Sequence, residues 1–414
     1  MSDVRVVVTG IGIVSPVGLT VASSWDALIN GRSGIARISA FDPTDFETHI
    51  AAEVSDFDPE NYMDRKEARR ADRFSQLALA AAQEAVTQAG LIQDEPLGNR
   101  TSSLIASGVG GIITLSEQFG VLHEKGPKRV SPFLIPAMLI DMAAANVSMK
   151  YGAKGPSYAT VSACASGADA IGGGYDLIKR GEIDVALCGG TEAPVCPIAL
   201  AGFNSVGALS KNNENPEGAS RPFDAKRDGF IIGEGATVLV IEELGHALAR
   251  GATPLVELVG YGSSSDASHI TQPAPFGEGG ARAMRQAIES ANLKPADVDY
   301  INAHGTSTAM NDKFETEAIK GVFGEGAHAV AISSTKSMTG HLLGAAGAME
   351  SAICAMSIMN GCIPPTTNLE NPDPECDLDY TPNKARHTQV NVAMTNSLGF
   401  GGHNASLVFQ RYQD

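Results

Sequence analysis

The 414-residue chain lacks several features that would place it in common protein classes. It has no run of eighteen apolar residues, so the sequence predicts no membrane-spanning helix. The first residues, MSDVRVVVTG, show no charged-then-apolar signal pattern. The six cysteines form no CxxC pair and no zinc-ligand spacing, which indicates reduced thiols and predicts no metal site. We therefore expect a cytoplasmic protein.

Positive charge is also scarce. The chain has 30 Lys and Arg against 47 Asp and Glu, a net charge of −17, which argues against bulk binding to nucleic acid or anionic lipid. Two basic clusters are therefore informative, although charge runs are usually only solvated faces. One is RKEARRADR at 65–73 and the other is EKGPKR at 124–129. Together they favour an acidic partner.

A complete dinucleotide-binding fingerprint is missing as well. A predicted buried strand at 4–10 runs into GIGIVSPVG, which resembles half of the GxGxxG pattern. The third glycine is absent, Pro16 interrupts the helix start, and no acidic residue stands where the ribose contact would be. The sequence predicts no nucleotide site here.

The stretch VSACASGADA at 161–170 is the most informative one present. An apolar, β-favouring run leads into Cys164, and the hydrophobic period then changes toward that of a helix, which predicts a strand, a sharp turn and a helix beginning at the cysteine. A thiol at a helix N-terminus faces unpaired N–H groups that favour thiolate, and the small neighbours leave room for an acyl group. The alternative is that Cys164 is simply a buried small hydrophobic residue.

An internal repeat indicates two related halves. VSACASG at 161–167 has a counterpart in ISSTKSMTG at 332–340, and GEGATVLVIEE at 233–243 has one in GGHNASLVFQR at 401–411. We expect an α/β protein with halves at 1–251 and 252–414, two mixed sheets, and helices on both faces and between them. The glycine-rich helices after each motif are expected to be buried in close backbone contact.

The second half places further reactive side chains near predicted strand ends. His304 follows a buried strand in YINAHGTST, and Lys336 and His341 flank a strand-to-helix turn in STKSMTGH. Phe400 lies in the glycine-rich turn NSLGFGGHN. Any one of these could be structural, but strand ends of α/β sheets are where active sites collect.

This order of motifs resembles the β-ketoacyl-acyl carrier protein synthases, and within them the elongating Cys-His-His class of type II systems in the thiolase superfamily. The resemblance covers essentially the whole chain and includes SRPFDAKRDGFIIGEGA and IPPTTNLENPDPECDLDY. It implies a thiolase-like fold, a layered α/β/α/β/α sandwich, and a homodimer. It implies an acyltransferase of fatty acid chain elongation that needs no metal or cofactor and takes its substrates from acyl carrier protein.

The resemblance also implies roles for single residues. Cys164 would carry the acyl group, and neutral His304 and His341 would donate from Nε2 to the enolate formed when malonyl-acyl carrier protein loses carbon dioxide. Lys336 would orient the histidines. The backbone N–H groups of Cys164 and Phe400 would form an oxyanion hole, with Phe400 also acting as a gate.

Further residues are implied around this centre. Glu350 is a candidate ionic partner of Lys336, Thr306 and Thr308 would hold the pantetheine arm, and Val109 and Phe203 would line the acyl pocket. The basic clusters would dock the carrier protein beside the tunnel mouth, through Lys66, Arg69, Arg70, Lys128 and Arg129.

The sequence departs from the common family pattern at His403, where Thr is frequent, and at Leu398, where Phe is frequent. We expect His403 to brace its turn rather than to act in catalysis. Four alternatives differ from this family in single features or in their product. A degradative thiolase would need a second reactive cysteine near the last glycine turn, a starter synthase would carry Asn in place of His341, and a silent partner subunit would lack Cys164. A polyketide ketosynthase stays open because it uses the same residues.

Overall fold

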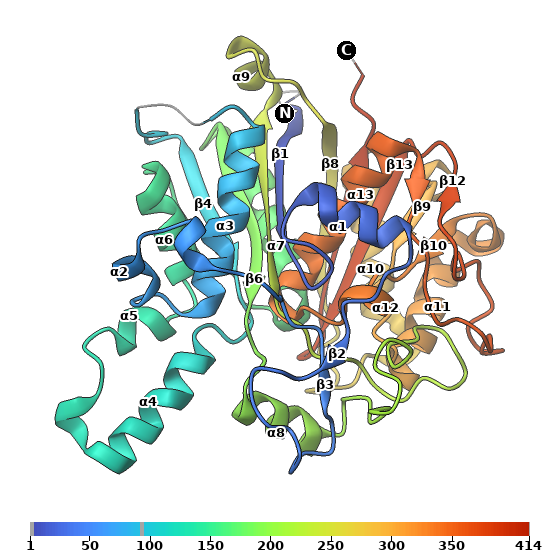
Figure 1. Cartoon of the computed structure of the whole chain (residues 1–414). Coiled ribbons are helices and arrows are strands. Elements are labelled where there is room, and N and C mark those ends of the chain that lie inside the picture. The colour runs from blue at the N-terminus through green and yellow to red at the C-terminus, as the bar shows by residue number, and fades with distance from the viewer. Residues whose placement is uncertain (1–3, 92–94, 414) are drawn as a thin grey trace.

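The computed structural model describes residues 4–91 and 95–413 (Figure 1). In this part of the chain, ten strands form one continuous sheet in the order β10-β9-β13-β14-β8-β1-β7-β6-β4-β5. The first half of the chain contributes β1 (Val6–Val14), β4 (Thr101–Ala106), β5 (Ser157–Tyr158), β6 (Val185–Glu192) and β7 (Gly235–Glu243). The second half contributes β8 (Val256–Ser265), β9 (Tyr300–Asn302), β10 (Ala331–Ser333), β13 (Val392–Gly399) and β14 (His403–Gln410).

The two sets of five strands have the same pairing pattern. In the first half β1 pairs antiparallel with β7 and β7 with β6, whereas β6 pairs parallel with β4 and β4 with β5. In the second half β8, β14, β13, β9 and β10 repeat this sequence of two antiparallel and two parallel pairings. The two expected mixed sheets are present as two five-stranded β layers, but they are continuous with each other, because β1 and β8 pair antiparallel between Val6–Val8 and Val256–Leu258.

Helices cover this sheet in three layers. Helices α3 (Arg73–Gln88) and α6 (Met142–Tyr151) share an apolar core with the first half. Helices α10 (Glu278–Ser290) and α11 (Ala309–Phe323) do so with the second. The largest core cluster joins strands of both halves through α7 (Ser166–Lys179) and α13 (Ala346–Asn360), which lie between them (Figure 1). The predicted layered sandwich is confirmed.

The remaining strands and helices lie around this framework. They are β2 (Ala36–Arg37), β3 (Ile50–Ala51), β11 (Cys362–Ile363), β12 (Arg386–His387), α1 (Val21–Ile29), α2 (Arg65–Ala68), α4 (Ile112–Lys125), α5 (Leu134–Met138), α8 (Pro197–Val206), α9 (Leu244–Ala249) and α12 (Lys336–Thr339). Seven 3₁₀ turns accompany them in the described residues: η1 (Pro59–Asn61), η2 (Pro127–Arg129), η3 (Ala163–Ala165), η4 (Pro275–Gly277), η5 (Pro295–Asp297), η6 (Gly324–His328) and η7 (Leu343–Ala345). None of the described helices is long and apolar enough to cross a membrane.

The central helices α7 and α13 meet backbone to backbone, as the glycine content predicted. A Cβ atom on Gly167 would lie 2.8 Å from the Gly344 carbonyl oxygen, and one on Gly347 would lie 2.8 Å from the Ala168 nitrogen. Real Cβ atoms do not approach so closely, so only glycine permits this packing. The contact fixes the helix that follows Cys164 against the equivalent helix of the second half.

The glycines of the incomplete fingerprint have a structural use. Gly10 and Gly12 lie inside β1, and a Cβ atom at Gly12 would come within 1.9 Å of the Ala81 carbonyl oxygen on α3. Both glycines therefore allow α3 to pack closely on β1, and this packing explains the two glycines without a nucleotide site.

One part of the predicted repeat was wrong in register. The segment 332–340 is β10 and α12, whereas the counterpart of 161–167 is 341–347, since η7 and α13 follow one another as η3 and α7 do. The second half has an additional helix, α12, between β10 and η7, whereas the first half has no helix between β5 and η3. Because of this insertion, the motif at 161–167 was aligned with a segment that precedes its true counterpart. The other repeat, β7 with β14, is confirmed by the matching sheet positions.

Candidate functional site

A cavity of about 590 Å³ opens where the carboxyl ends of strands from both halves meet. Its lining includes seven side chains singled out in the sequence together with the turn at Phe400. They are Val109, Cys164, Phe203, His304, Thr306, Thr308 and His341. The structure thus gathers residues that lie up to 291 positions apart, from Val109 to Phe400, around one hollow.

Cys164 lies on a strained turn. It is the middle residue of η3, and Ala163 before it has a φ of 51°, a left-handed conformation that costs energy for a residue with a Cβ. The strand before it is shorter than predicted, and α7 begins at Ser166 rather than at the cysteine. The turn presents the thiol to the cavity with 9% of the residue exposed.

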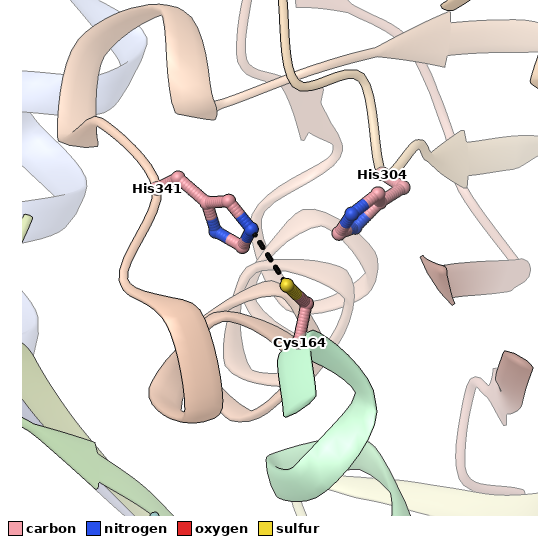
Figure 2. Close-up of side chains that lie close together, drawn as sticks. All are labelled: Cys164, His304 and His341. Carbon is pink, nitrogen blue, oxygen red and sulfur yellow. Dashed lines mark hydrogen bonds between the residues drawn. The ribbon is translucent and has the colours of Figure 1, made fainter. Parts of the chain in front are cut away.

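His341 lies beside this thiol. Its Nε2 is 3.0 Å from the Cys164 Sγ, and the three side chains Cys164, His304 and His341 point toward one another (Figure 2). The backbone N–H of Leu343 donates to His341 Nδ1 at 3.2 Å. Because Nδ1 accepts this bond, neutral His341 carries its proton on Nε2 and directs it at the sulfur.

His304 is fixed in the same tautomer by a different group. Lys336 Nζ lies 3.3 Å from His304 Nδ1 and also pairs with Glu350. An ammonium group can only donate, so His304 Nδ1 accepts and its Nε2 carries the proton. The predicted Lys336–Glu350 pair is therefore present, and it lies behind His304 rather than in the cavity lining.

Both histidines are neutral. Burial and the nearby Lys336 ammonium lower the pKa of His304 and of His341 well below the ordinary value of 6.5. Burial also raises the pKa of the Glu350 carboxyl, which Lys336 partly offsets. The site therefore offers two imidazole N–H donors whose state is insensitive to pH near neutrality.

The expected preference of Cys164 for the thiolate form was wrong for the resting protein. Burial raises the pKa of the Cys164 thiol to about 11, although Lys336 and the backbone N–H of Phe400 lower it in part. Glu192 and Glu350 raise it further. Loss of hydration and the two carboxylates thus outweigh Lys336 and the Phe400 N–H, so the resting side chain is a thiol.

The turn at Phe400 joins β13 to β14 beside η3. A Cβ atom on Gly399 would lie 2.7 Å from the Ser162 carbonyl oxygen and 3.1 Å from the Cys164 nitrogen, so only a glycine lets the two segments approach this closely. The Phe400 backbone N–H acts on the Cys164 sulfur. The Phe400 N–H therefore lies within reach of the sulfur, and an oxyanion hole that also uses the Cys164 N–H stays a prediction.

The remaining predicted lining residues fall into two groups. Thr306 and Thr308 present hydroxyl groups with their Oγ1 atoms 2.9 Å apart. Val109 and Phe203 form an apolar part of the cavity wall. Phe203 packs edge-on against Phe230, with 5.5 Å between the ring centroids. The cavity therefore combines a polar side with an apolar one.

The basic residues lie outside this lining. Lys66 is on α2, Arg69 and Arg70 follow it, and Lys128 and Arg129 are on η2; all five are exposed. The Arg70 guanidinium lies 4.4 Å from the ring centroid of Phe133, four residues after Arg129, so the segments that carry the two clusters touch at this point. Docking of a carrier protein there is a proposal.

A thiol and two imidazoles could in principle hold a metal ion, and the ligand atoms of Cys164, His304 and His341 lie within 4.8 Å of one another. A histidine that binds metal through Nε2 donates its Nδ1 proton to an acceptor. Here both Nδ1 atoms face donors, Leu343 N–H and Lys336 Nζ. The surroundings hold the tautomer opposite to the one a metal needs, so the residues do not fit a metal centre.

Three residues of the site were missed in the sequence. Glu315 on α11 accepts hydrogen bonds at 2.8 Å from the backbone N–H groups of His304 and Gly305, and burial raises its pKa to about 7. Phe230 lies edge-on to His341 at 5.2 Å. Glu192 ends β6 fully buried beside the cysteine turn. A charged residue closing the buried run IDVALCGGTE was a signal that could have been followed.

The two departures from the family pattern have separate places. Leu398 lines the cavity, whereas the exposed His403 turns its ring toward Gly401, where a Cβ atom would lie 3.0 Å from the His403 Nε2. The bracing role expected for His403 stays a prediction.

Comparison with known proteins gives the family. The β-ketoacyl synthase N-terminal domain matches residues 3–247 and the C-terminal domain matches residues 255–370. The chain is 50% identical over 409 residues to the 3-oxoacyl-[acyl-carrier-protein] synthase 2 of Synechocystis sp., covering 99% of this chain and 98% of that protein.

Solved structures of similar proteins support the same family assignment. A β-ketoacyl synthase from Burkholderia phymatum has a TM-score of 0.93 and 39% identity, covering 99% of this chain and 100% of the other. The type II polyketide complex AntDE:AntF, a ketosynthase with its acyl-carrier protein and a bound hexaketide, has a TM-score of 0.91 and 34% identity, covering 99% and 100%. The family predicted from the sequence is confirmed: with its thiolase-like fold and a Cys-His-His centre, the chain belongs to the β-ketoacyl synthases.

Proposed function

We propose that this protein is an elongating 3-oxoacyl-acyl carrier protein synthase, an acyltransferase that joins an acyl group to malonyl-acyl carrier protein with loss of carbon dioxide. The observation that carries the proposal is the 3.0 Å contact of Cys164 Sγ with His341 Nε2, in a cavity where both histidines direct N–H groups inward. The relative from Synechocystis sp. bears the name of this activity.

In the first stage Cys164 attacks the thioester of an acyl carrier protein. The new C–S bond forms, the old one breaks, and the thiol proton ends on the departing carrier thiol. Since His341 donates to the sulfur, it stabilises negative charge on Sγ as the proton leaves, which offsets the unfavourable burial of a thiolate. The N–H groups of Cys164 and Phe400 would stabilise the oxyanion of the tetrahedral intermediate.

In the second stage malonyl-acyl carrier protein takes the place of the first carrier. Its carboxylate leaves as carbon dioxide, and the electron pair delocalises onto the thioester oxygen as an enolate. Neutral N–H donors at His304 and His341 stabilise this oxygen more than they stabilise the ground-state carbonyl. The enolate carbon then attacks the acyl group, and Cys164 leaves as a thiolate that takes a proton from solvent.

Lys336 serves as a positioning residue in this scheme. It holds the His304 tautomer through Nδ1 and is itself held by Glu350. Thr306 and Thr308 would bind the amides of the pantetheine arm, Val109 and Phe203 would bound the acyl chain, and Phe400 would move when Cys164 is acylated. No diffusible cofactor enters these steps.

The test is an assay with a ladder of acyl-carrier-protein thioesters and malonyl-acyl carrier protein. Formation of 3-oxoacyl-carrier protein with one carbon dioxide per turnover is expected. A protein that transfers acyl groups but forms no C–C bond would contradict the proposal.

A polyketide ketosynthase is the second candidate, favoured by the structural match to the AntDE:AntF complex. The two activities differ in the number of extensions before release. A single extension per priming event supports fatty acid elongation, whereas products extended repeatedly without reduction would indicate the polyketide activity.

We also propose a homodimer. Strand β5 is the edge of the ten-stranded sheet, and both of its residues are exposed, with the Tyr158 side chain among them. Val161, three residues after Tyr158, is also 54% exposed. Uncovered edge strands with apolar neighbours pair readily with another chain, and a second copy offers the same edge. Light scattering of Tyr158→Asp against the native protein tests this, and a monomeric native protein would contradict it.

Two further expectations remain proposals. A boundary between 251 and 252 lies between the two matched family domains. Co-expressed fragments 1–251 and 252–414 should associate, and failure of the fragments to associate would count against this boundary.

A cytoplasmic location is supported by the six unpaired cysteines among the described residues, and recovery of the protein in another cell fraction would contradict it.

A further inference from the structure

The carboxylate of Glu192 is fully buried and is surrounded by hydrogen-bond donors. Its Oε1 accepts from Ser107 Oγ at 2.6 Å and from the Val109 N–H at 3.1 Å. Its Oε2 accepts from the N–H groups of Gly108 at 2.7 Å and Gly344 at 2.9 Å. Burial raises the pKa of Glu192, and these four donors lower it in part. All four partners donate and both oxygens accept, which is the arrangement of an ionised carboxylate.

These donors belong to two segments that shape the active site from opposite halves of the fold. Gly108 and Val109 line the cavity. Gly344 directly follows Leu343, whose N–H holds the tautomer of His341. The space between the segments is filled, because a Cβ atom on Gly344 would lie 2.4 Å from the Gly108 nitrogen and 2.7 Å from Glu192 Oε2.

We infer that Glu192 is a positioning residue that locks the acyl-pocket wall at Val109 to the turn carrying His341, and so sets both the acyl chain length accepted and the alignment of His341 with Cys164. It lies outside the cavity lining and touches no reacting atom. The inference rests on the proposed role of Cys164 as the acylated residue.

The charge of Glu192 also reaches the thiol. The charged or titratable groups that act on Cys164 are Lys336, which lowers its pKa, and Glu192 and Glu350, which raise it, with neutral His304 and His341 beside them. Removing the Glu192 charge should therefore shift the alkylation profile of Cys164 toward lower pH. A carboxylate that only satisfied buried N–H groups far from the site would not do this.

The experiment compares Glu192→Gln with the native protein and with Glu84→Gln. Glu84 likewise accepts two backbone N–H groups, from Ile13 at 3.0 Å and Val21 at 2.9 Å, but does so away from the cavity. Self-acylation is measured with octanoyl- and palmitoyl-coenzyme A, and alkylation with iodoacetamide is measured against pH. For Glu192→Gln we expect acylation to fall by about 10- to 100-fold, the loss caused by displacing reacting groups by about 1 Å, with an altered octanoyl-to-palmitoyl ratio. Glu84→Gln should match the native protein in both measurements.

Ser107→Ala provides a second variant, which keeps the carboxylate but removes one of its donors. A smaller change of the chain-length ratio in the same direction is expected, and this variant decides the matter if Glu192→Gln does not fold. An unchanged ratio and an unchanged alkylation profile in a folded variant would overturn the inference. If the native protein takes up no acyl group, the proposed function fails, while the alkylation profile still decides the role of Glu192.

Discussion

Gly344 occupies in the second half of the fold the place that Cys164 occupies in the first. Each is the middle residue of a 3₁₀ turn that leads into a central helix, η3 into α7 and η7 into α13. The residues before them, Ala163 and Leu343, share a left-handed backbone with φ of 51° and 48°. The duplicated turn thus carries a thiol in only one half, and in the other half it presents a backbone N–H.

This asymmetry predicts that Cys164 is the sole acylated residue. The other five cysteines are buried among the described residues, and none of them lines the cavity. Cys164→Ala should abolish the covalent adduct seen by intact-protein mass spectrometry after incubation with acyl-carrier protein, because no other thiol reaches the substrate. An adduct on a different cysteine of the variant would show that the assignment is mistaken.

The histidines should matter most for decarboxylation. His304→Ala and His341→Ala each remove one N–H donor from the enolate, and loss of such a donor costs about 10²–10³ in rate. Carbon dioxide release from malonyl-acyl carrier protein should fall by that amount while acylation of Cys164 remains detectable. Of the two, His341→Ala should slow acylation more, because His341 contacts the sulfur at 3.0 Å. Decarboxylation at the native rate in either variant would rule out the role.

The raised pKa of Cys164, about 11, gives a pH dependence with a definite sign. The reactive thiolate is the deprotonated form, so its fraction increases with pH up to the thiol pKa. The rate of alkylation by iodoacetamide should rise about tenfold per pH unit between pH 7 and 9. Cys164→Ala supplies the background. A rate that is already constant above pH 7 would mean that the helix N-terminus and Lys336 overcome burial.

The buried pair of Lys336 and Glu350 predicts a stability effect. Both side chains are almost fully buried, at 2% and 3% exposure. Lys336→Met leaves a carboxylate unpaired in the core, and breaking a buried pair in this way costs about 3–5 kcal/mol. The free energy of unfolding from urea titrations should fall by that amount.

The double variant Lys336→Met/Glu350→Gln is the control for this effect. It should recover part of the loss, since no buried charge remains without its partner. Equal losses in the single and double variants would show that packing, rather than charge, decides the effect.

The basic surface predicts a substrate-dependent effect. Charge reversal at Lys66 and Arg69 should raise the KM for carrier-bound substrates, because the carrier protein is acidic and the chain as a whole repels it with a net charge of −17. Added salt should reduce the difference between variant and native protein. Turnover of a free acyl-coenzyme A should change little. Equal loss with both kinds of substrate would mean that the segment supports the fold instead.

The positions of Cys164 and His304 could be predicted from sequence because each follows a β-favouring run, and the topology of an α/β sheet brings such strand ends together. His341 instead follows α12, after β10 has ended at Ser333, so its place beside Cys164 comes from the turn into η7. The same motifs could not reveal the correct alignment of the two halves. Helix α12 is present only in the second half, so no segment of the first half marks it as an insertion.

Long-range contacts and desolvation set the limit of that prediction. Glu192 contacts Gly344 across 152 positions, so nothing in its own neighbourhood in sequence reveals the partner. The pKa of Cys164 depends on how completely the fold removes water from the thiol and on distant charges, neither of which can be read from the local motif. A sequence motif indicates which groups meet, whereas the balance of burial and charge needs the packed structure.

The most direct test of the account is a chase of the isolated acyl-enzyme. Protein acylated on Cys164 by an acyl-carrier protein is separated from free substrate and mixed with malonyl-acyl carrier protein, and both proteins are followed by mass spectrometry. The account predicts that the adduct on Cys164 disappears as a 3-oxoacyl group, two carbons longer, appears on the carrier protein with release of carbon dioxide. An adduct that persists while malonyl-acyl carrier protein is decarboxylated, or that is lost only as free fatty acid, would contradict it.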